Sequence, residues 1–141
     1  MLSSTFNLER FVQAQEAVYD AACSELALGR KTTHWMWFVF PQLAQLGRSA
    51  IARHYGVQGR LEAAAYWAHP LLGSRLKHCT ALVLAVPDKS AGEIFSAPDD
   101  LKLGSCMTLF EAVAPEEPVF AQVLTQYFDG QRDIHTVALL A

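Results

Sequence analysis

The stretch Thr33–Leu43 constrains the fold more than any other part of the chain. It reads Thr-His-Trp-Met-Trp-Phe-Val-Phe-Pro-Gln-Leu and brings two tryptophans and two phenylalanines into a few positions. Each aromatic side chain buries a large area, so a cluster this dense belongs where several elements converge. The stretch is also too short to cross a membrane. We therefore predict that it forms the centre of the core.

The composition is typical of one globular domain that covers residues 1–141. Hydrophobic residues make up 52% of the chain and charged residues 18%, which favours a packed core over disorder. The formal net charge is −3, and the lysines and arginines form no cluster. This pattern argues against nucleic-acid binding, which needs basic residues gathered on one face. A small anionic ligand held in a local pocket is compatible with it.

The sequence favours a cytoplasmic location without a membrane segment. Met1–Asn7 lacks the basic start and apolar run of an export signal, and the longest later apolar stretch, Leu82–Pro87, is far too short to span a bilayer. An odd number of widely spaced cysteines indicates free thiols in a reducing compartment (Cys23, Cys79 and Cys106). No metal-ligand spacing, P-loop or dinucleotide-binding motif is present, so we predict no metal and no cofactor.

The periodicity of apolar residues predicts an all-α fold. Apolar residues recur at helical spacing along most of the chain, and no strand-like run alternates so as to pair with the aromatic stretch. We predict a compact domain of roughly seven to eight mostly short helices around that buried stretch. A helix capped by Asn7 runs from Leu8 to a terminating Gly29, and Thr33 caps the aromatic helix. Three further residues are predicted N-caps: Ser49, Ser90 and Asp133.

The most informative polar feature is Asp99-Asp100-Leu101-Lys102, which opens a helix that is apolar nearly all round. Lys102 falls in the first turn, where a positive charge opposes the helix dipole and free N–H groups bind anions. Asp100 and Lys102 are therefore candidate catalytic residues, and Ser105 and Thr108 are candidate ligand contacts. Alternatively, Lys102 pairs with a neighbouring acid, and both hydroxyls bond to the carbonyl one turn earlier.

A second group of candidates lies in the N-terminal half. His34, beside two tryptophans, is the third catalytic candidate, because histidine serves as an acid or base near neutral pH. Trp37 could form an aromatic wall, and Lys31 and Arg48 flank the stretch and could bring charge to its rim. Gln15 lies on the apolar face of the first helix and either lines a polar pocket or bonds to a neighbouring element. His34 has the same structural alternative.

Four motifs, in this order, resemble one bacterial family. They are Arg10–Gln15, His34–Leu43, the segment Glu62–Pro70, and Asp100–Phe110. The family is filed as domain of unknown function 1810 and is sometimes labelled calpastatin. The resemblance extends from about Leu8 to the C-terminus and implies a compact all-helical fold without an established activity. The calpastatin label conflicts with the composition, because such an inhibitor is a disordered repeat protein.

Two functional hypotheses follow. In the first, Gln15, Lys31, His34, Trp37, Asp100, Lys102, Ser105 and Thr108 form one pocket that binds or processes a nucleotide- or sugar-phosphate-like anion. In the second, the chain is a non-enzymatic protein-interaction or homodimerisation module, and these residues belong to the core. The two hypotheses differ in whether His34 and Lys102 open into one cleft with an indole wall.

Overall fold

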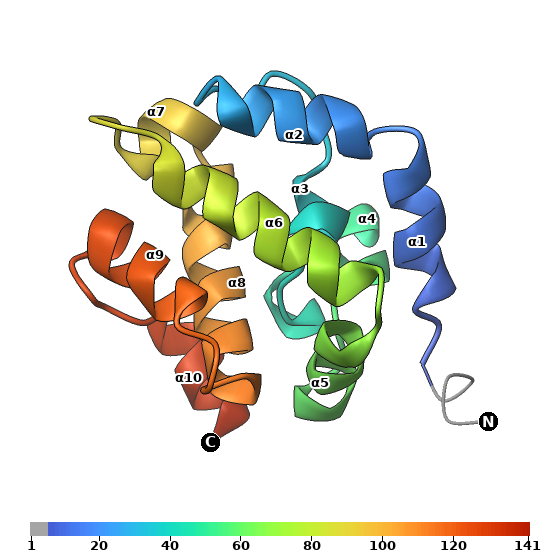
Figure 1. The fold of residues 1–141 in the computed structure, drawn as a ribbon. Coiled ribbons are helices and arrows are strands. Elements are labelled where there is room, and N and C mark those ends of the chain that lie inside the picture. The colour runs from blue at the N-terminus through green and yellow to red at the C-terminus, as the bar shows by residue number, and fades with distance from the viewer. Residues whose placement is uncertain (1–5) are drawn as a thin grey trace.

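The computed structural model describes residues 6–141, and the secondary structure of this part is helical (Figure 1). Its elements in chain order are α1 (Glu9–Glu16), α2 (Tyr19–Ala27), α3 (Met36–Val39), the 3₁₀ helix η2 (Ala44–Leu46), α4 (Ala50–His54), α5 (Arg60–Ala68), α6 (Leu72–Ala85), α7 (Ala91–Phe95), α8 (Asp99–Val113), α9 (Val119–Phe128) and α10 (Ile134–Leu140). The all-α prediction is therefore confirmed. The predicted number of helices is too low, because residues 6–141 contain ten α-helices. Most of Met1–Asn7, where no export signal was predicted, lies outside the described residues.

One reason for the higher number is a break in the predicted N-terminal helix. Val18 leaves the helical region of the backbone, with φ −124° and ψ −9°, and separates α1 from α2. The two helices then run in different directions over the body of the molecule (Figure 1). Each helix thus buries its own face, with Phe11 and Gln15 on α1 and Ala22, Glu25 and Leu26 on α2. Gly29, at φ +73°, follows the end of α2, as predicted.

The local capping signals were accurate at three of five positions, and Asn7 is one of the two exceptions, because α1 has Leu8 at its N-cap and no side-chain cap. Ser49 Oγ accepts a hydrogen bond from Ala52 N at 3.1 Å, Ser90 forms a capping box with its helix, and Asp133 caps α10. The prediction for Thr33 is also wrong: α3 begins at Met36, and the Thr33 hydroxyl instead donates to Glu25 Oε2 at 2.6 Å. The Thr33 hydroxyl therefore donates to a charged acceptor, and such a bond is stronger than one between neutral groups.

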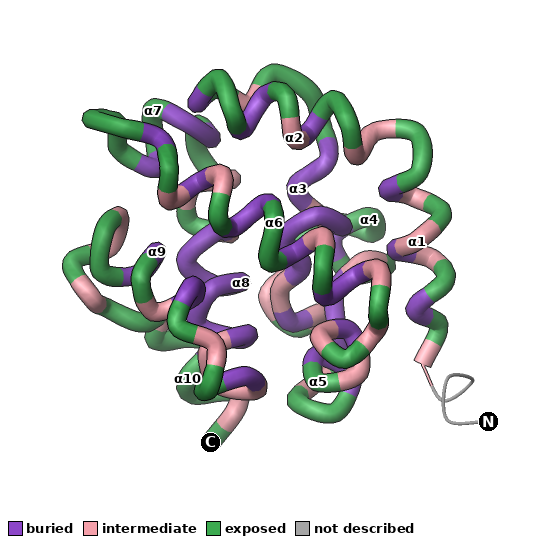
Figure 2. The backbone as a smooth tube through the Cα atoms, in the orientation of Figure 1, coloured by how far each residue is buried: buried purple, intermediate pink, exposed green. Residues whose placement is uncertain are grey.

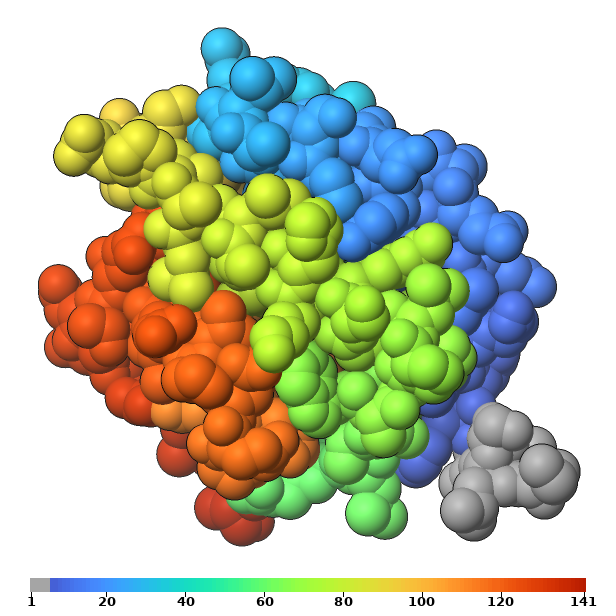
Figure 3. Space-filling view, in the orientation of Figure 1, coloured from blue at the N-terminus to red at the C-terminus, as the bar shows by residue number. Residues whose placement is uncertain are grey.

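The aromatic stretch and α8 form the centre of the core, as Figure 2 shows by their buried backbone. Trp35 and Phe40 are fully enclosed, and both pack against Phe95 of α7 with ring centroids 6.4 and 5.9 Å apart. Every residue of α8 from Leu103 to Phe110 is buried, because α5, α7, α9 and α10 all contact this helix. On another face, α2, α6 and α9 form a continuous surface (Figure 3).

The segment between α3 and α4 is held in place by backbone hydrogen bonds. Ala44 N donates to Val57 O at 2.8 Å, and Val57 N donates to Gln42 O at 2.9 Å. This short parallel bridge fixes the segment Gln42–Ser49 opposite the first half of α8 and places its polar side chains there. Among residues 6–141, no helix has the length and apolar character needed to cross a bilayer.

Candidate functional site

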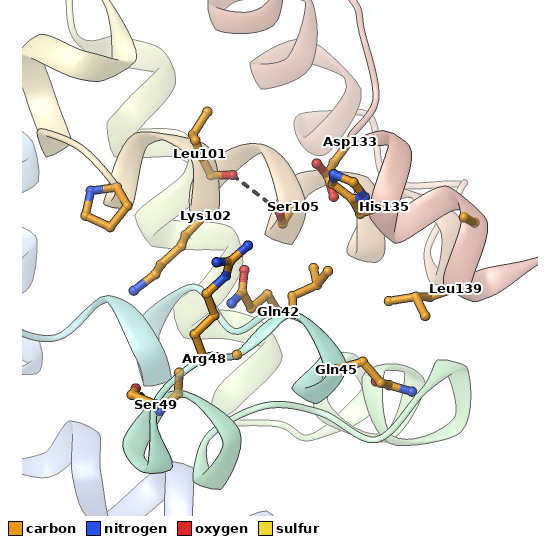
Figure 4. A pocket seen from close by; sticks show the side chains of 15 residues that line it. Gln42, Gln45, Arg48, Ser49, Leu101, Lys102, Ser105, Asp133, His135 and Leu139 are labelled. Atoms are coloured by element: carbon orange, nitrogen blue, oxygen red, sulfur yellow. Dashed lines mark hydrogen bonds between the residues drawn. The ribbon is translucent and has the colours of Figure 1, made fainter.

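A cleft of about 840 Å³ lies between the segment Gln42–Ser49, the N-terminal half of α8 and α10 (Figure 4). Its volume is within the range of small-molecule sites, roughly 300–1,000 Å³. Its lining is mixed: Gln42, Gln45, Leu46, Gly47, Arg48, Ser49, Ala52, Pro98, Leu101, Lys102, Ser105, Asp133, His135, Ala138 and Leu139. We call this feature the α8–α10 cleft.

Several polar side chains of the α8–α10 cleft are not engaged by the rest of the protein. Among residues 6–141, the side chains of Gln42, Gln45, Arg48 and His135 take part in no hydrogen bond or ion pair. The guanidinium of Arg48 points across the cleft toward α8 and Ser105 (Figure 4). These side chains therefore keep their full hydrogen-bonding capacity for another molecule.

Lys102 lies at one end of the cleft and also belongs to an ion-pair network. Its Nζ is 3.5 Å from Asp99 Oδ1 and 5.5 Å from the ring centroid of Trp37. The second oxygen of Asp99 pairs more closely with Lys31, at 2.9 Å, and Lys31 lies over the Trp35 ring. Two ammonium groups thus share one carboxylate, so this end of the cleft keeps a net positive charge. The pairing of Lys102 with a neighbouring acid agrees with the alternative drawn from the sequence.

The two hydroxyl candidates on α8 have different surroundings. Ser105 Oγ donates to Leu101 O at 3.3 Å and lines the cleft. Thr108 is buried, donates to Gly104 O at 2.8 Å, and accepts a hydrogen bond from Asp133 N at 2.9 Å. Thr108 therefore positions Asp133 and does not reach the cleft. Both hydroxyls bond to the carbonyl one turn earlier, as the alternative interpretation predicts.

Gln15 lies in the core, away from the cleft. Its Nε2 donates to Phe38 O at 2.7 Å and to the Tyr66 hydroxyl at 3.1 Å, and its Oε1 accepts from Arg75 at 3.3 Å. These bonds satisfy a side chain that is only 1% exposed. Of the two interpretations of Gln15, the geometry therefore supports the one in which its side chain bonds to neighbouring elements of the protein.

His34 and Asp100 do not line the α8–α10 cleft. His34 is exposed on the segment before α3, and Asp100 Oδ1 accepts from Leu101 N at 2.9 Å at the start of α8. Of the eight predicted site residues, the cleft contains Lys102 and Ser105. The network around Asp99 also brings Lys31, Lys102 and Trp37 together, but His34 and Lys102 do not share the cleft.

The strongest electrostatic feature that the sequence did not reveal is Glu25 on α2. Its carboxylate accepts from Thr32 N at 2.7 Å, Thr33 N at 3.0 Å, the Thr33 hydroxyl, and Trp35 Nε1 at 3.0 Å. Burial alone would raise its pKa, but the hydrogen bonds from Thr33, Thr32 and Trp35 outweigh burial and lower the pKa to about 2. Glu25 thus fixes the entry into the aromatic stretch. The donors lie seven to ten positions downstream, at the start of the aromatic stretch, and no local spacing rule connects them with an acid on the preceding helix.

The cleft residues Gln42, Gln45, Asp133 and His135 were likewise not identified as site candidates. Arg48 was noted only as a charge beside the aromatic stretch, and Asp133 only as a helix cap. One signal could have identified Gln42: it is a polar residue directly after the buried run that ends at Pro41. Nothing in the sequence indicates that this segment faces α10.

The comparisons agree with the resemblance in the sequence. The family described as protein of unknown function (DUF1810) matches residues 5–140. The chain belongs to this family. A crystal structure of the conserved hypothetical protein Rv1873 from Mycobacterium tuberculosis is 51% identical, with a TM-score of 0.95, and the match covers 96% of this chain and 97% of that chain. A comparison with curated proteins finds no match.

Cys106 lies inside α8. It is fully buried and does not line the cleft. Burial raises the pKa of its thiol well above the ordinary value, so the thiol stays protonated near neutral pH. Cys106 therefore belongs to the packed core.

Proposed function

We propose that the α8–α10 cleft binds a small anionic ligand of the nucleotide- or sugar-phosphate type. The observation that carries this proposal is Arg48, whose guanidinium faces α8 across the cleft without an ion-pair partner among residues 6–141. An arginine fork matches the oxygens of a phosphate group, and such charge-assisted bonds are stronger than neutral ones. Arg48 is exposed, and it differs from an ordinary hydrated surface arginine in that it shares an open cleft with Lys102.

The surroundings of Arg48 support the same ligand chemistry. Lys102 lies on the facing wall, and it is held to Asp99 by the longer of that carboxylate's two contacts, 3.5 Å against 2.9 Å for Lys31. An incoming phosphate can therefore replace the Asp99 contact of Lys102 while Lys31 keeps Asp99 neutralised. Ser105 Oγ and the Gln42 amide lie beside the Arg48 guanidinium (Figure 4), and the N–H groups of the Gln42 amide offer further donors.

The proposal concerns binding and assigns no reaction. His34 and Asp100, two of the three catalytic candidates, do not line the cleft. The third, Lys102, is well placed to neutralise charge on a bound anion. Its proposed role is therefore that of a ligand contact.

The decisive experiment is calorimetric titration of the protein with inorganic phosphate and pyrophosphate at low salt. Arg48→Ala is expected to weaken binding about 10- to 100-fold, because a hydrogen bond to a charged group contributes roughly 1.5–3 kcal/mol. Lys102→Ala should weaken it less, because part of its charge is already neutralised. The matched control is Arg53→Ala, which removes the same charge from an exposed position on α4 outside the cleft. An equal loss in both arginine variants would show non-specific attraction and contradict the proposal.

A second candidate function, self-association, is favoured by the outer face of α10. Ile134 and Val137 on this helix are 74% and 49% exposed and do not line the α8–α10 cleft, whereas Leu139 does. Apolar residues gathered on one helix are a common mark of an interaction surface. Sedimentation velocity over a range of protein concentrations tests it: a dimer in the wild type that Val137→Glu dissociates would support this function, and a monomer throughout would exclude self-association.

A further inference from the structure

We infer that the α8–α10 cleft has a second subsite, formed by Gln45, Asp133 and His135, that binds hydroxyl groups of the ligand. The inference rests on the proposed function and narrows it: the ligand is a phosphorylated polyol, such as a sugar phosphate, and not a simple anion. The three side chains lie farther along the cleft than Lys102 and Arg48, with Asp133 and His135 on one side and Gln45 on the other (Figure 4).

Asp133 is the central group of this subsite because its carboxylate is fixed and only half used. Its Oδ2 accepts from Thr136 N at 2.9 Å and from the Thr136 hydroxyl at 2.6 Å. Its own backbone N donates to Thr108 Oγ1 at 2.9 Å. The other oxygen, Oδ1, accepts no hydrogen bond from residues 6–141. A ligand hydroxyl therefore meets an acceptor that is already oriented and loses little entropy on binding.

The chemistry of the three groups distinguishes between ligand classes. A carboxylate repels a second phosphate but accepts strongly from a hydroxyl, which is how an acidic side chain holds a ribose in dinucleotide sites. Gln45 and His135 carry hydrogen-bonding groups on both sides of the subsite. A hydroxyl group both donates and accepts, so it can donate to Asp133 and accept from an N–H group of Gln45 or His135, whereas an ammonium group has donors only. The arrangement of a cationic end and a hydroxyl-accepting end thus fits a sugar phosphate better than a diphosphate or a phosphorylated amine.

The test compares four probes by calorimetry: inorganic phosphate, ribose 5-phosphate, phenyl phosphate and phosphoethanolamine. Ribose 5-phosphate should bind the wild type at least about tenfold more tightly than phosphate, as expected for one added bond to a charged acceptor. Asp133→Asn should remove most of this advantage, while phosphate itself binds equally well or slightly more tightly because a negative charge has been lost. Asparagine is as good an N-cap as aspartate, so α10 is expected to remain folded.

Gln45→Ala provides a second variant that carries no folding risk, since Gln45 is exposed and makes no hydrogen bond with residues 6–141. It should reduce the ribose 5-phosphate advantage and leave phosphate binding unchanged. The inference is overturned if phenyl phosphate or phosphoethanolamine exceeds inorganic phosphate in affinity by as much as ribose 5-phosphate does. It is also overturned if neither Asp133→Asn nor Gln45→Ala changes the affinity of ribose 5-phosphate relative to phosphate. If Arg48→Ala leaves phosphate binding intact, the proposed anion site is wrong. The subsite is still supported in that case if Asp133→Asn weakens the binding of ribose 5-phosphate. No binding of any probe overturns both.

Discussion

The polar groups around the aromatic stretch and those of the α8–α10 cleft are arranged in opposite ways. Around the stretch, Gln15 and Glu25 are buried, and each side chain bonds to several partners. No buried side-chain nitrogen or oxygen in the described part of the chain is left without a partner. In the cleft, the side chains of Gln42, Gln45 and Arg48 make no hydrogen bond or ion pair with residues 6–141, and the segment that carries them is held by its backbone bonds to Val57.

This difference separates groups that specify the fold from groups that are available to a ligand. A saturated buried network stabilises one arrangement, since each lost partner leaves a group that is neither solvated nor bonded. Open polar groups on a rigid frame contribute little to folding and remain free to bind. The following substitutions test whether the buried polar groups determine stability and the polar groups of the cleft determine binding.

Glu25→Ala should give the largest loss of stability, because it leaves two backbone N–H groups and the Trp35 indole without an acceptor. We expect the free energy of unfolding to fall by about 2–4 kcal/mol, because a buried donor left without its acceptor costs about 1–3 kcal/mol and several donors are affected. Urea denaturation measures the change. The matched control is Glu16→Ala, which removes the same charge from an exposed position and should stay within about 0.5 kcal/mol. Similar losses in both variants would contradict the role assigned to Glu25.

Glu25 also predicts how stability depends on pH. Its pKa is about 2 in the folded state against an ordinary value of 4.5. The folded value is the lower one, so the stabilisation is fully present above about pH 4.5 and is lost as the pH falls toward 2. This difference corresponds to at most about 3 kcal/mol. Urea denaturation between pH 3 and pH 6, compared with Glu25→Gln, should show a steeper acid loss in the wild type. Parallel curves would contradict the prediction.

The sequence specified the helices better than their junctions because most helix signals are local. Ser49, Ser90 and Asp133 lie beside the N–H groups that they cap, so their residue type is informative by itself. The break at Val18 was missed because the apolar spacing continues through it, and packing decides where the chain turns. The core around Trp35 followed from the dense clustering of aromatic residues in one stretch, because so much aromatic area has to be buried.

The site was harder to predict because its parts meet only in the folded chain. Gln42 and Arg48 precede α4, whereas Asp133 and His135 lie at the start of α10. No spacing rule connects segments so far apart. Lys102 and Ser105 were found because they lie on one helix with a marked start. Gln15 was misleading for the opposite reason, since a buried amide has the same sequence pattern whether it bonds to protein or to a ligand.

Gln15→Leu should have an intermediate effect on stability and none on binding. The substitution leaves Phe38 O with the weaker 3.3 Å bond from Tyr66, and it removes the acceptor of Arg75. We expect a loss of about 1–3 kcal/mol, the usual cost of unsatisfied buried groups, against little change for the exposed Gln13→Leu. Thermal unfolding measures the loss, and calorimetry with phosphate should give the wild-type affinity. A loss of phosphate binding would show that Gln15 takes part in ligand binding, and the division between buried groups that stabilise the fold and cleft groups that bind would then be wrong.

Arg48→Ala should have the smallest effect on stability, although it is expected to abolish most phosphate binding. The side chain is exposed and without a partner in residues 6–141, and its charge lies near that of Lys102. Without ligand, the free energy of unfolding should change by no more than about 0.5 kcal/mol, with a slight gain because repulsion between the two cations is relieved. With saturating phosphate, the wild type should rise in melting temperature and Arg48→Ala should not. A loss above about 1 kcal/mol without ligand would mean that Arg48 supports the fold, and the contrast between the core and the cleft would not hold at this residue.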